Sequence, residues 1–232
     1  MDLQSSTELT RRGAVAATVA GLFLPAFPSR GLAAVDVQPM ARVSHFPQMP
    51  TGFVGVTPCG SHAPPATIHS FARIAPESEP GEALEITGIV YRHDRRTPAP
   101  GMVVFAYHTD ARGRYNTPNS PFNPRLYGWV KSDGDGRYGF RTIRPAPYPD
   151  HSTPAHIHVS LFGAGVPEYW VDDYWFAGDP LITPAQRRLL TNRGGGGETM
   201  TLRRGADGVL RGKRDFVVEH VTVSGGCTIL SA

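Results

Sequence analysis

The sequence predicts an all-β fold, namely a β-sandwich of mostly antiparallel strands with long loops and one short helix. Glycine and proline are abundant, with 26 and 22 of 232 residues. No long stretch lacks turn-forming residues, which favours short strands over long helices. Short β-prone segments recur along the chain with turns between them, a pattern typical of a β-sandwich. The length suits one domain with a sizeable core.

Residues 1–34 are expected to be an export signal rather than part of the fold. An arginine pair at positions 11–12 precedes a short apolar run at 14–24, and small residues suited to cleavage follow at 33–34. The run is too short for a comfortable membrane span, and the arginine pair is similar to that of a twin-arginine signal. We therefore expect an exported protein, periplasmic or extracellular, with no stable membrane insertion after cleavage. An uncleaved signal acting as an anchor is the alternative.

Residues 35–78 are rich in proline and show no helical period, so we expect an extended arm that wraps the domain formed by residues 79–232. Within that domain, β-prone segments alternate with turns. The expected strands are residues 83–91, 102–108, 126–131, 137–143, a strand containing His156 and His158, 168–176, 199–202 and 215–223.

Two local signals define a turn and a helix. Residues 132–136 (Ser-Asp-Gly-Asp-Gly) form a strong turn signal, which predicts a hairpin between the strands at 126–131 and 137–143. A calcium loop is not expected there because the closing glutamate is missing. Thr183 and the residues after it predict the helix, since threonine caps it, proline takes the first helical position and glutamine is the reciprocal partner. We expect this helix to end near Asn192.

The two cysteines, Cys59 and Cys227, are too far apart for a Cys-x-x-Cys metal or redox motif. In an oxidising compartment they could form one disulfide that ties the two ends of the domain together. Two unrelated thiols are the alternative.

The charge pattern does not indicate a nucleic-acid partner. The net charge is only +3, and the basic residues are scattered rather than clustered with aromatic residues on one face. We expect the basic residues at 203–204 and 211–214 to lie in solvated turns.

His156 and His158 form a His-x-His motif in an apolar, β-prone segment. In a strand, side chains two residues apart point to the same face, so the two imidazoles would lie side by side, as a metal site needs. Upstream, Tyr148 stands between two prolines that restrict the backbone around it. A purely structural, hydrogen-bonded histidine pair is the alternative.

Tyr115 and Tyr148 extend this pair to a set of two tyrosines and two histidines. Free tyrosine has a pKa of about 10, so it binds as tyrosinate only where a strong Lewis acid offsets the loss of its proton. Ferric iron does so, whereas zinc and calcium generally take other ligands. Spacing alone does not single out these tyrosines.

The ordered motifs resemble those of the intradiol ring-cleavage dioxygenases, in particular the protocatechuate 3,4-dioxygenase-like, secreted branch. The resemblance covers residues 81–223. Its pieces are residues 88–115 ending in Gly-Arg-Tyr, 132–145, the Pro-Tyr-Pro at 147–149 with Pro-Ala-His-Ile-His at 154–158, and Phe-Ala-Gly-Asp-Pro at 176–180.

This resemblance implies one non-haem Fe(III) held by Tyr115, Tyr148, His156 and His158. It assigns to Tyr115 the axial position that is vacated, with uptake of a proton, when a catechol binds, while Tyr148 stays bound. The implied substrates are a small aromatic diol and O2, and the implied product is a cis,cis-muconate. The arm lacks the helical dimerisation segment of catechol 1,2-dioxygenases, which favours secreted single-domain relatives and leaves the oligomeric state open.

The sequence departs from the family pattern around the site. Thr153 stands where the family usually carries an arginine three residues before the first histidine. Asp173, or else Asp172, replaces a glutamine, and Trp129 replaces a further arginine. Changes of this kind are expected to alter rate or substrate, or to abolish turnover, while leaving metal binding intact.

Two alternatives therefore stand beside the dioxygenase interpretation. One is a ferric-binding protein of the same fold with weak or altered oxygenase activity, and the other is a metal-free β-sandwich used for binding. Arg125 or Arg144 replaces the missing charge only if the fold brings one of them to the site.

Overall fold

The computed structural model describes residues 64–222, apart from positions 118, 120, 122–123, 164, 189 and 197–198, together with residues 229–230. The predicted export signal at 1–34 and most of the predicted arm lie outside the described residues. Cys59 and Cys227 do too, so their pairing stays a prediction. No helix in the described ranges is long and apolar enough to cross a membrane.

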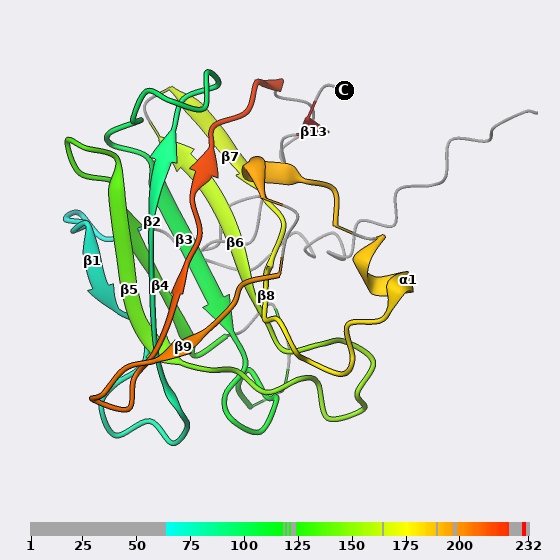
Figure 1. Cartoon of the computed structure of the whole chain (residues 1–232). Helices are drawn as coiled ribbons and strands as arrows, with labels where there is room; N and C mark the ends of the chain where they lie inside the picture. Colours follow the sequence, from blue (N-terminus) through cyan, green and yellow to red (C-terminus); the bar gives the residue numbers. More distant parts are fainter. Residues whose placement is uncertain are drawn as a thin grey trace, which may run out of the picture. The chain divides into compact units, whose positions relative to one another are not determined.

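Two β-sheets packed face to face form a β-sandwich, as predicted (Figure 1). The sheet that we call the site sheet has the order β4-β3-β6-β7, with β8 also paired to β6. The support sheet has the order β1-β5-β2-β10-β9, with β11 also paired to β2. Most pairings are antiparallel, whereas β1 on β5, and β10 and β11 on β2, run parallel.

The elements have the following bounds. The site sheet contains β3 (Val103–His108), β4 (Leu126–Lys131), β6 (His156–Gly163), β7 (Val166–Trp170) and β8 (Tyr174–Trp175). The support sheet contains β1 (Phe71–Arg73), β2 (Ala83–Tyr91), β5 (Arg137–Ile143), β9 (Arg203–Arg204), β10 (Leu210–Lys213) and β11 (Phe216–Val217). The remaining elements are the helix α1 (Pro184–Arg187), the 3-10 turn η1 (Arg193–Gly195), and the paired strands β12 (Val221–Thr222) and β13 (Ile229–Leu230).

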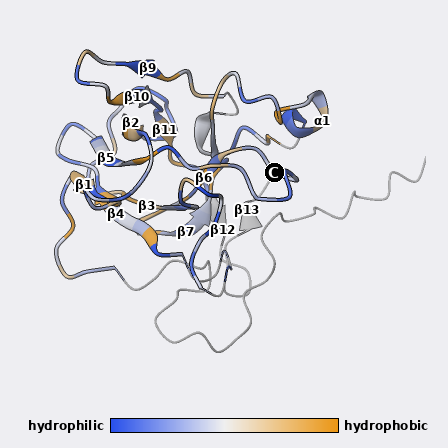
Figure 2. Ribbon diagram, turned by 90° about the horizontal axis from the view of Figure 1, so that it is seen from below, coloured by the Kyte–Doolittle hydropathy of each residue, from blue (hydrophilic) through white to orange (hydrophobic). Residues whose placement is uncertain are grey.

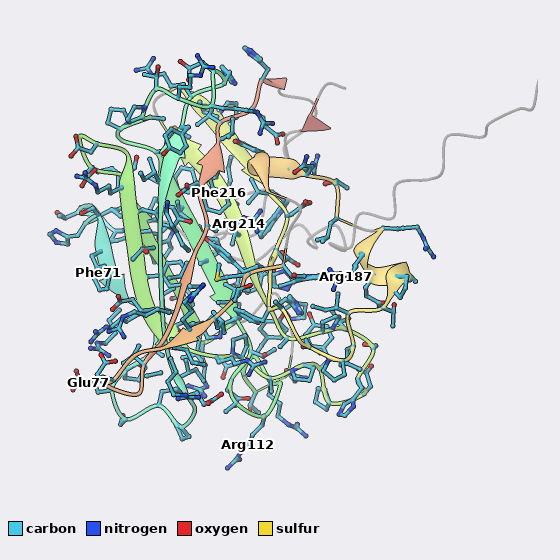
Figure 3. The ribbon with its side chains drawn as sticks, in the orientation of Figure 1. Phe71, Glu77, Arg112, Arg187, Arg214 and Phe216 are labelled. Atoms are coloured by element: carbon cyan, nitrogen blue, oxygen red, sulfur yellow. The ribbon has the colours of Figure 1, made fainter. Side chains whose placement is uncertain are left out.

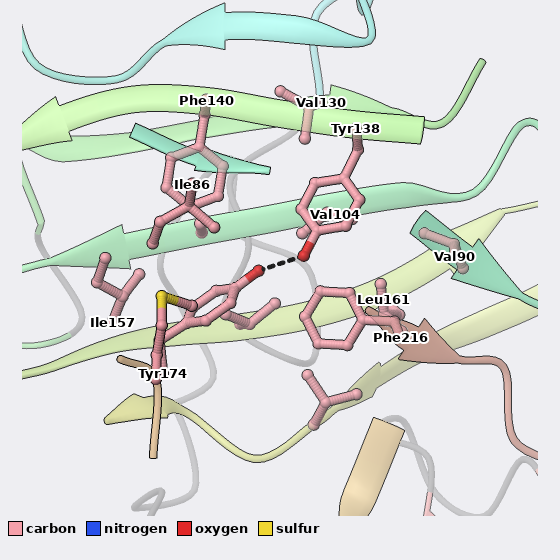
Figure 4. Close-up of a cluster of buried hydrophobic side chains, with 14 of the residues drawn as sticks. Ile86, Val90, Val104, Val130, Tyr138, Phe140, Ile157, Leu161, Tyr174 and Phe216 are labelled. Atoms are coloured by element: carbon pink, nitrogen blue, oxygen red, sulfur yellow. Dashed lines mark hydrogen bonds between the residues drawn. The ribbon is translucent and has the colours of Figure 1, made fainter. Parts of the chain in front are cut away.

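The hydrophobic core fills the space between the sheets. Buried and more exposed residues alternate along β2, and Ile86 and Val90 point inward. Ile157 and Leu161 of β6 belong to the same cluster (Figure 4). The helix α1 buries none of its residues, and its ribbon is largely hydrophilic (Figure 2). The helix is therefore a surface feature, and the fold rests on the two sheets.

The strands β3 and β6 are buried on both faces, and this positions the site. All of β3 and the first six residues of β6 are buried. One face is the sandwich core. The other is an aromatic cluster that includes Phe105, Tyr107 and Tyr115. Because Tyr107 pairs with His158 across the two strands, His158 and His156 lie on the aromatic side.

Four predicted strands form with the expected bounds or within one residue of them, namely β2, β3, β4 and β5. The predicted hairpin is wrong, however. The turn at 132–136 does form, with the Gly136 amide donating to the Asp133 carbonyl. Its two strands then diverge, because β4 pairs with β3 while β5 pairs with β2 in the other sheet. The turn therefore connects the two sheets of the sandwich.

The carboxyl-terminal half departs further from the prediction. The strand expected at 168–176 is two strands, with a break at 171–173. The helix ends at Arg187 rather than near Asn192, since it has no buried residue to hold another turn. At 199–202 only one isolated bridge forms, between Met200 and Phe176.

The segment 211–214, expected to be a solvated turn, mostly belongs to β10, and Arg214 at its end is 8 % exposed. A parallel partner for this short, charged strand is supplied by β2, which is distant in sequence. Local composition cannot reveal such a pairing. Likewise, β1 within the predicted arm forms by pairing with β5.

Gly88 is required by a close backbone approach. A Cβ atom at this position would lie 1.7 Å from the carbonyl oxygen of Arg214. We predict that Gly88→Ala lowers the free energy of unfolding by about 3 kcal/mol, because β2 must move away from the 214 backbone. Urea unfolding at 25 °C measures it. Gly134→Ala is the matched control, since its Cβ would meet nothing within 4 Å, and equal losses in the two variants would contradict the prediction.

His108 should make stability depend on pH. Its Nδ1 lies 2.7 Å from the Thr109 carbonyl and its Nε2 lies 2.6 Å from the Thr142 hydroxyl. Burial lowers its pKa to about 4. Between pH 6.5 and 4 the unfolded chain therefore binds the proton first, and stability is lost as pH falls through this window.

We predict that the unfolding free energies of the wild type and His108→Gln converge by about 3 kcal/mol between pH 7 and pH 4. Urea titrations at a series of pH values measure both curves. Parallel curves would show that His108 is not held neutral.

Candidate metal centre

The β6 strand places two imidazoles on one face. His156 and His158 point to the aromatic side, while Ile157 between them is buried in the sandwich core. The two Nε2 atoms are 3.0 Å apart. The predicted side-by-side arrangement of the histidines is therefore present.

Two loops bring the tyrosines to these histidines. Tyr115 follows a tight turn in which the side chain of Asp110 accepts hydrogen bonds from the amides of Arg112 and Arg114. Gly113 in this turn has a φ of +75°, and a Cβ there would lie 2.1 Å from the carbonyl oxygen of Pro147. Only glycine permits this approach. The two loops can therefore touch, and Tyr148 comes beside Tyr115.

The four side chains predicted as ligands converge through their polar atoms. The hydroxyl oxygens of Tyr115 and Tyr148 are 2.8 Å apart. The Tyr115 hydroxyl is also 2.9 Å from Nε2 of His158. The ring of Tyr148 packs edge-on against that of His156, with centroids 5.2 Å apart. Two phenol oxygens and two imidazole nitrogens thus form one compact donor set.

The opposite ring nitrogens determine how the histidines can act. Nδ1 of His156 lies 2.6 Å from the Pro154 carbonyl, and Nδ1 of His158 lies 3.1 Å from the Asp173 carboxylate. Both partners are acceptors, so both Nδ1 atoms carry the proton. Each Nε2 then presents a lone pair, and the two lone pairs face each other across 3.0 Å.

This donor set fits a cation. The Tyr115 hydroxyl can donate one hydrogen bond to Nε2 of His158. None of the four side chains then has a hydrogen-bond donor left that reaches Nε2 of His156. Burial lowers the pKa of His156 to about 4, with His158 adding to the effect, so Nε2 of His156 does not itself take up a proton near neutral pH. A metal ion between the two nitrogens would satisfy both lone pairs, and the phenol oxygens are suitably placed to complete its coordination.

The tyrosines need a strong Lewis acid to bind as anions. Burial, followed by the nearby Tyr148, raises the pKa of Tyr115 far above its ordinary value. Burial also raises the pKa of Tyr148. Both are therefore neutral phenols near pH 7 until a cation offsets the loss of the proton. Trivalent iron does this far better than a divalent ion.

Asp173, predicted to lie near the site, contacts Nδ1 of His158 and not the four converging oxygen and nitrogen atoms. Its carboxylate is on the Nδ1 side of the ring. Burial opposes its ionisation, but His158, His156 and Arg214 outweigh burial, so the pKa of Asp173 lies below its ordinary value. A carboxylate on the far nitrogen of a ligating histidine fixes the ring and increases its basicity. The other candidate, Asp172, instead accepts hydrogen bonds from Thr191.

Arg125 and Arg144, the two arginines that could have replaced the missing charge, both have other partners. Thr153 is half-buried in the loop before β6. Arg125 forms a two-pronged ion pair with Glu79, with both distances 2.5 Å. Arg144 lies over the ring of Phe176, with its central carbon 5.9 Å from the ring centroid. Each guanidinium is therefore engaged with partners outside the four-residue donor set.

Trp129, predicted to stand in place of a further arginine, belongs to the aromatic face. Its ring packs on Phe105 and Tyr127 at centroid distances of 5.4 Å. Its indole Nε1 is buried with no hydrogen-bond partner in the described part of the chain. This position is therefore apolar, with no charge to offer a ligand.

A cavity opens directly on the tyrosines. It has a volume of about 420 Å³ and is lined by Arg114, Tyr115, Asn119, Pro121, Tyr148, Pro149 and Asp150. This cavity can admit a small molecule beside the two tyrosines. A second cavity of about 460 Å³ lies along residues 144–147 and 179–181 and contains none of the four predicted ligands.

Sequence reasoning missed two residues at the site. Tyr107 packs its ring against His158 at 4.6 Å between centroids. Arg214 donates to the backbone carbonyl of Asp173. Alternation along β3 could have placed Tyr107 on the same face as Phe105, whereas no local signal indicated that Arg214 reaches the other sheet.

Comparison with known proteins agrees with this geometry. Residues 58–187, more than half of the chain, match a family model described as "Dioxygenase". The protocatechuate 3,4-dioxygenase beta chain of Burkholderia cepacia is 34% identical over 113 residues, covering 44% of this chain and 48% of that protein. Catechol 1,2-dioxygenase 1 of Acinetobacter lwoffii is 32% identical over 141 residues, covering 50% and 44%. The chain thus spans about half the length of these curated relatives.

Solved structures show the same fold. The dioxygenase domain of a carbohydrate-binding fusion protein from Streptomyces sp. SirexAA-E is 26% identical, with a TM-score of 0.50, covering 74% of this chain and 96% of that one. The 3-chlorocatechol 1,2-dioxygenase of Rhodococcus opacus 1CP has a TM-score of 0.52 at 19% identity, covering 74% and 70%. With the family match over more than half of the chain, these findings show that the protein belongs to the intradiol ring-cleavage dioxygenase family.

Proposed function

We propose that this chain is a ferric dioxygenase that cleaves a catechol-type aromatic diol between its two hydroxyl-bearing carbons. The observation that supports it is the convergence of two phenol oxygens and two imidazole nitrogens, with successive separations of 2.8, 2.9 and 3.0 Å. Both atoms of O2 enter the product, a cis,cis-muconate, so the atoms balance without an external reductant. Ferric iron, when bound, supplies the Lewis acidity that stabilises the phenolates and the redox centre for the reaction with O2.

The residues of the chain would divide the remaining tasks. His156, His158 and Tyr148 would hold the ion, with both ring orientations set by the acceptors on Nδ1. Tyr115 lines the cavity and would accept a proton from the entering diol, since its phenol is the more stable form in this buried setting. The aromatic face, with Tyr107 against His158, would keep water from the inner side of the site.

Two observations favour a second candidate, a ferric-binding protein of this fold with weak or altered oxygenase activity. Thr153 supplies no cation beside the site, and the carboxylate of Asp173 places a negative charge next to Nδ1 of His158. Both differences from the family pattern act on charge near the reacting oxygens. Oxygen uptake with a catechol separates this candidate from the first, and ferric binding separates both from a metal-free binding module.

The first prediction concerns the absorption spectrum. We expect the ferric-loaded chain to show a broad tyrosinate-to-iron charge-transfer band, which shifts when a catechol is added without oxygen. Admission of O2 should then consume one molecule of O2 per catechol. A chain that stays colourless after ferric loading would refute the proposal, and a shifting band without oxygen uptake would favour the second candidate.

The second prediction separates the two tyrosines. We expect Tyr115→Phe to keep iron but to lower kcat by about 100-fold, because the proton acceptor for the diol is lost. Tyr148→Phe should lower iron affinity and weaken the charge-transfer band. Steady-state kinetics and iron titration measure both. Tyr91→Phe, outside the donor set, is the control, and identical effects of the two site variants would contradict the division of roles.

A further inference from the structure

Asp173 reaches His158 because of a β-bulge. Ser160 of β6 pairs with Trp170 of β7, and Ile157 pairs with Tyr174 of β8. Three steps along β6 thus correspond to four steps along the partner segment, so residues 171–173 contain one extra residue. Bulges of this kind turn a side chain to the opposite face of a sheet.

The extra residue decides where the carboxylate points. Tyr169 and Val171 face the sandwich core, so regular alternation would bury Asp173 in that core as well. Instead Tyr174 faces the core, and Asp173 lies on the histidine side, 3.1 Å from Nδ1 of His158. Such a bulge leaves backbone groups outside the sheet ladder, and these groups need other partners.

Arg214 supplies that partner from the support sheet. Its Nη1 donates to the backbone carbonyl of Asp173 at 2.9 Å. Its guanidinium lies between the rings of Tyr174 and Phe216, at 5.0 and 4.9 Å from their centroids. Arg214 therefore contacts both Asp173 and the residue after it. In Figure 3, Arg214 and Phe216 lie within the layers, whereas Arg112 projects outward at the bottom of the view.

The backbone of Arg214 is itself held by two hydrogen bonds. Its amide donates to the Thr87 carbonyl at 3.0 Å, and its carbonyl accepts a hydrogen bond from the Tyr138 hydroxyl at 2.7 Å. The Tyr138 hydroxyl is also bonded to that of Tyr174 (Figure 4). Arg214 is thus anchored in one sheet and reaches the bulge in the other.

The burial of this cation calls for a functional explanation. Arg214 is 8 % exposed, and its Nε atom has no hydrogen-bond partner in the described ranges. None of the ion pairs among the described residues includes it. A buried, incompletely bonded guanidinium destabilises a fold, so an apolar residue would serve better if packing were its only role.

We infer that Arg214 is a positioning residue for the metal centre. It holds the 171–173 bulge so that the carboxylate of Asp173 stays on Nδ1 of His158. Nε2 of His158 then remains directed at the other three converging atoms. The effect of Arg214 on iron binding rests on the proposed function. Its effect on the His158 ring can be measured in the metal-free protein. Lysine cannot replace it fully, because an ammonium group lacks the planar fork that both donates and stacks.

The test measures the ring N–H proton of His158 directly. The full chain, labelled with ¹⁵N-histidine and purified without added iron, is compared with Arg214→Met, Arg214→Lys and Asp173→Ala by NMR. We expect a slowly exchanging Nδ1–H signal in the wild type and its loss in Asp173→Ala. Exchange should be about tenfold faster in Arg214→Met, as for a weakened hydrogen bond to a charged group, and intermediate in Arg214→Lys.

Arg203→Met, at an exposed position on β9, is the matched control and should exchange like the wild type. If Arg214→Met exchanges like the wild type while Asp173→Ala does not, Arg214 is only a core residue and the inference fails. Should Arg214→Met not fold, Arg214→Lys decides alone, and unchanged exchange in it overturns the inference.

A second readout uses ferric iron. Iron affinity, followed through the charge-transfer band, should fall about tenfold in Arg214→Met, the size expected when support of a ligating histidine is lost. A wild type that takes no iron would defeat the proposed function, and the exchange measurement would still decide the role of Arg214.

Discussion

The site depends on two imidazole nitrogens whose lone pairs face each other across 3.0 Å. The Pro154 carbonyl and the Asp173 carboxylate hold the proton of each histidine on the far nitrogen. Neither ring can relieve the repulsion by shifting its proton without losing a buried hydrogen bond. A cation between the rings removes the conflict, and the nearby phenols make a trivalent one the best match. The surrounding structure maintains this arrangement.

The sandwich maintains it by burying β6 on both faces. On the core face, Ile157 and its neighbours fix the register of the strand, since a slip by one residue would turn the histidines into the core. On the other face, aromatic rings exclude water, and burial keeps His156 and both tyrosines neutral. The glycine-permitted contact between the two tyrosine loops then sets the phenols beside the imidazoles. Packing thus determines the chemistry that each group can perform.

The support sheet also contributes to the site, although it carries none of the four predicted ligands. Arg214 crosses from its anchored position near β2 to the bulge that presents Asp173. The charge near the site is thereby organised differently from the family pattern that the sequence resembles. Thr153 leaves the usual position uncharged, while the half-buried carboxylate of Asp173 lies on Nδ1 of His158 and the buried guanidinium of Arg214 donates to the backbone carbonyl of Asp173.

The sequence by itself determined the local features. The alternation in β2, the β-prone segments at 126–131 and 137–143, the turn at 132–136 and the shared face of His156 and His158 all follow from patterns that a short segment contains. The ordered motifs also indicated the family and both tyrosines. The tertiary structure alone decided which strands pair, because β4 and β5 separate into different sheets although one turn joins them. It likewise decided that Asp173, rather than Asp172, contacts His158, because one extra residue in a bulge turns Asp173 to that face. It also brought Arg214 across the core to the bulge. Pairings between distant segments depend on which surfaces can be buried together, and no local pattern records that.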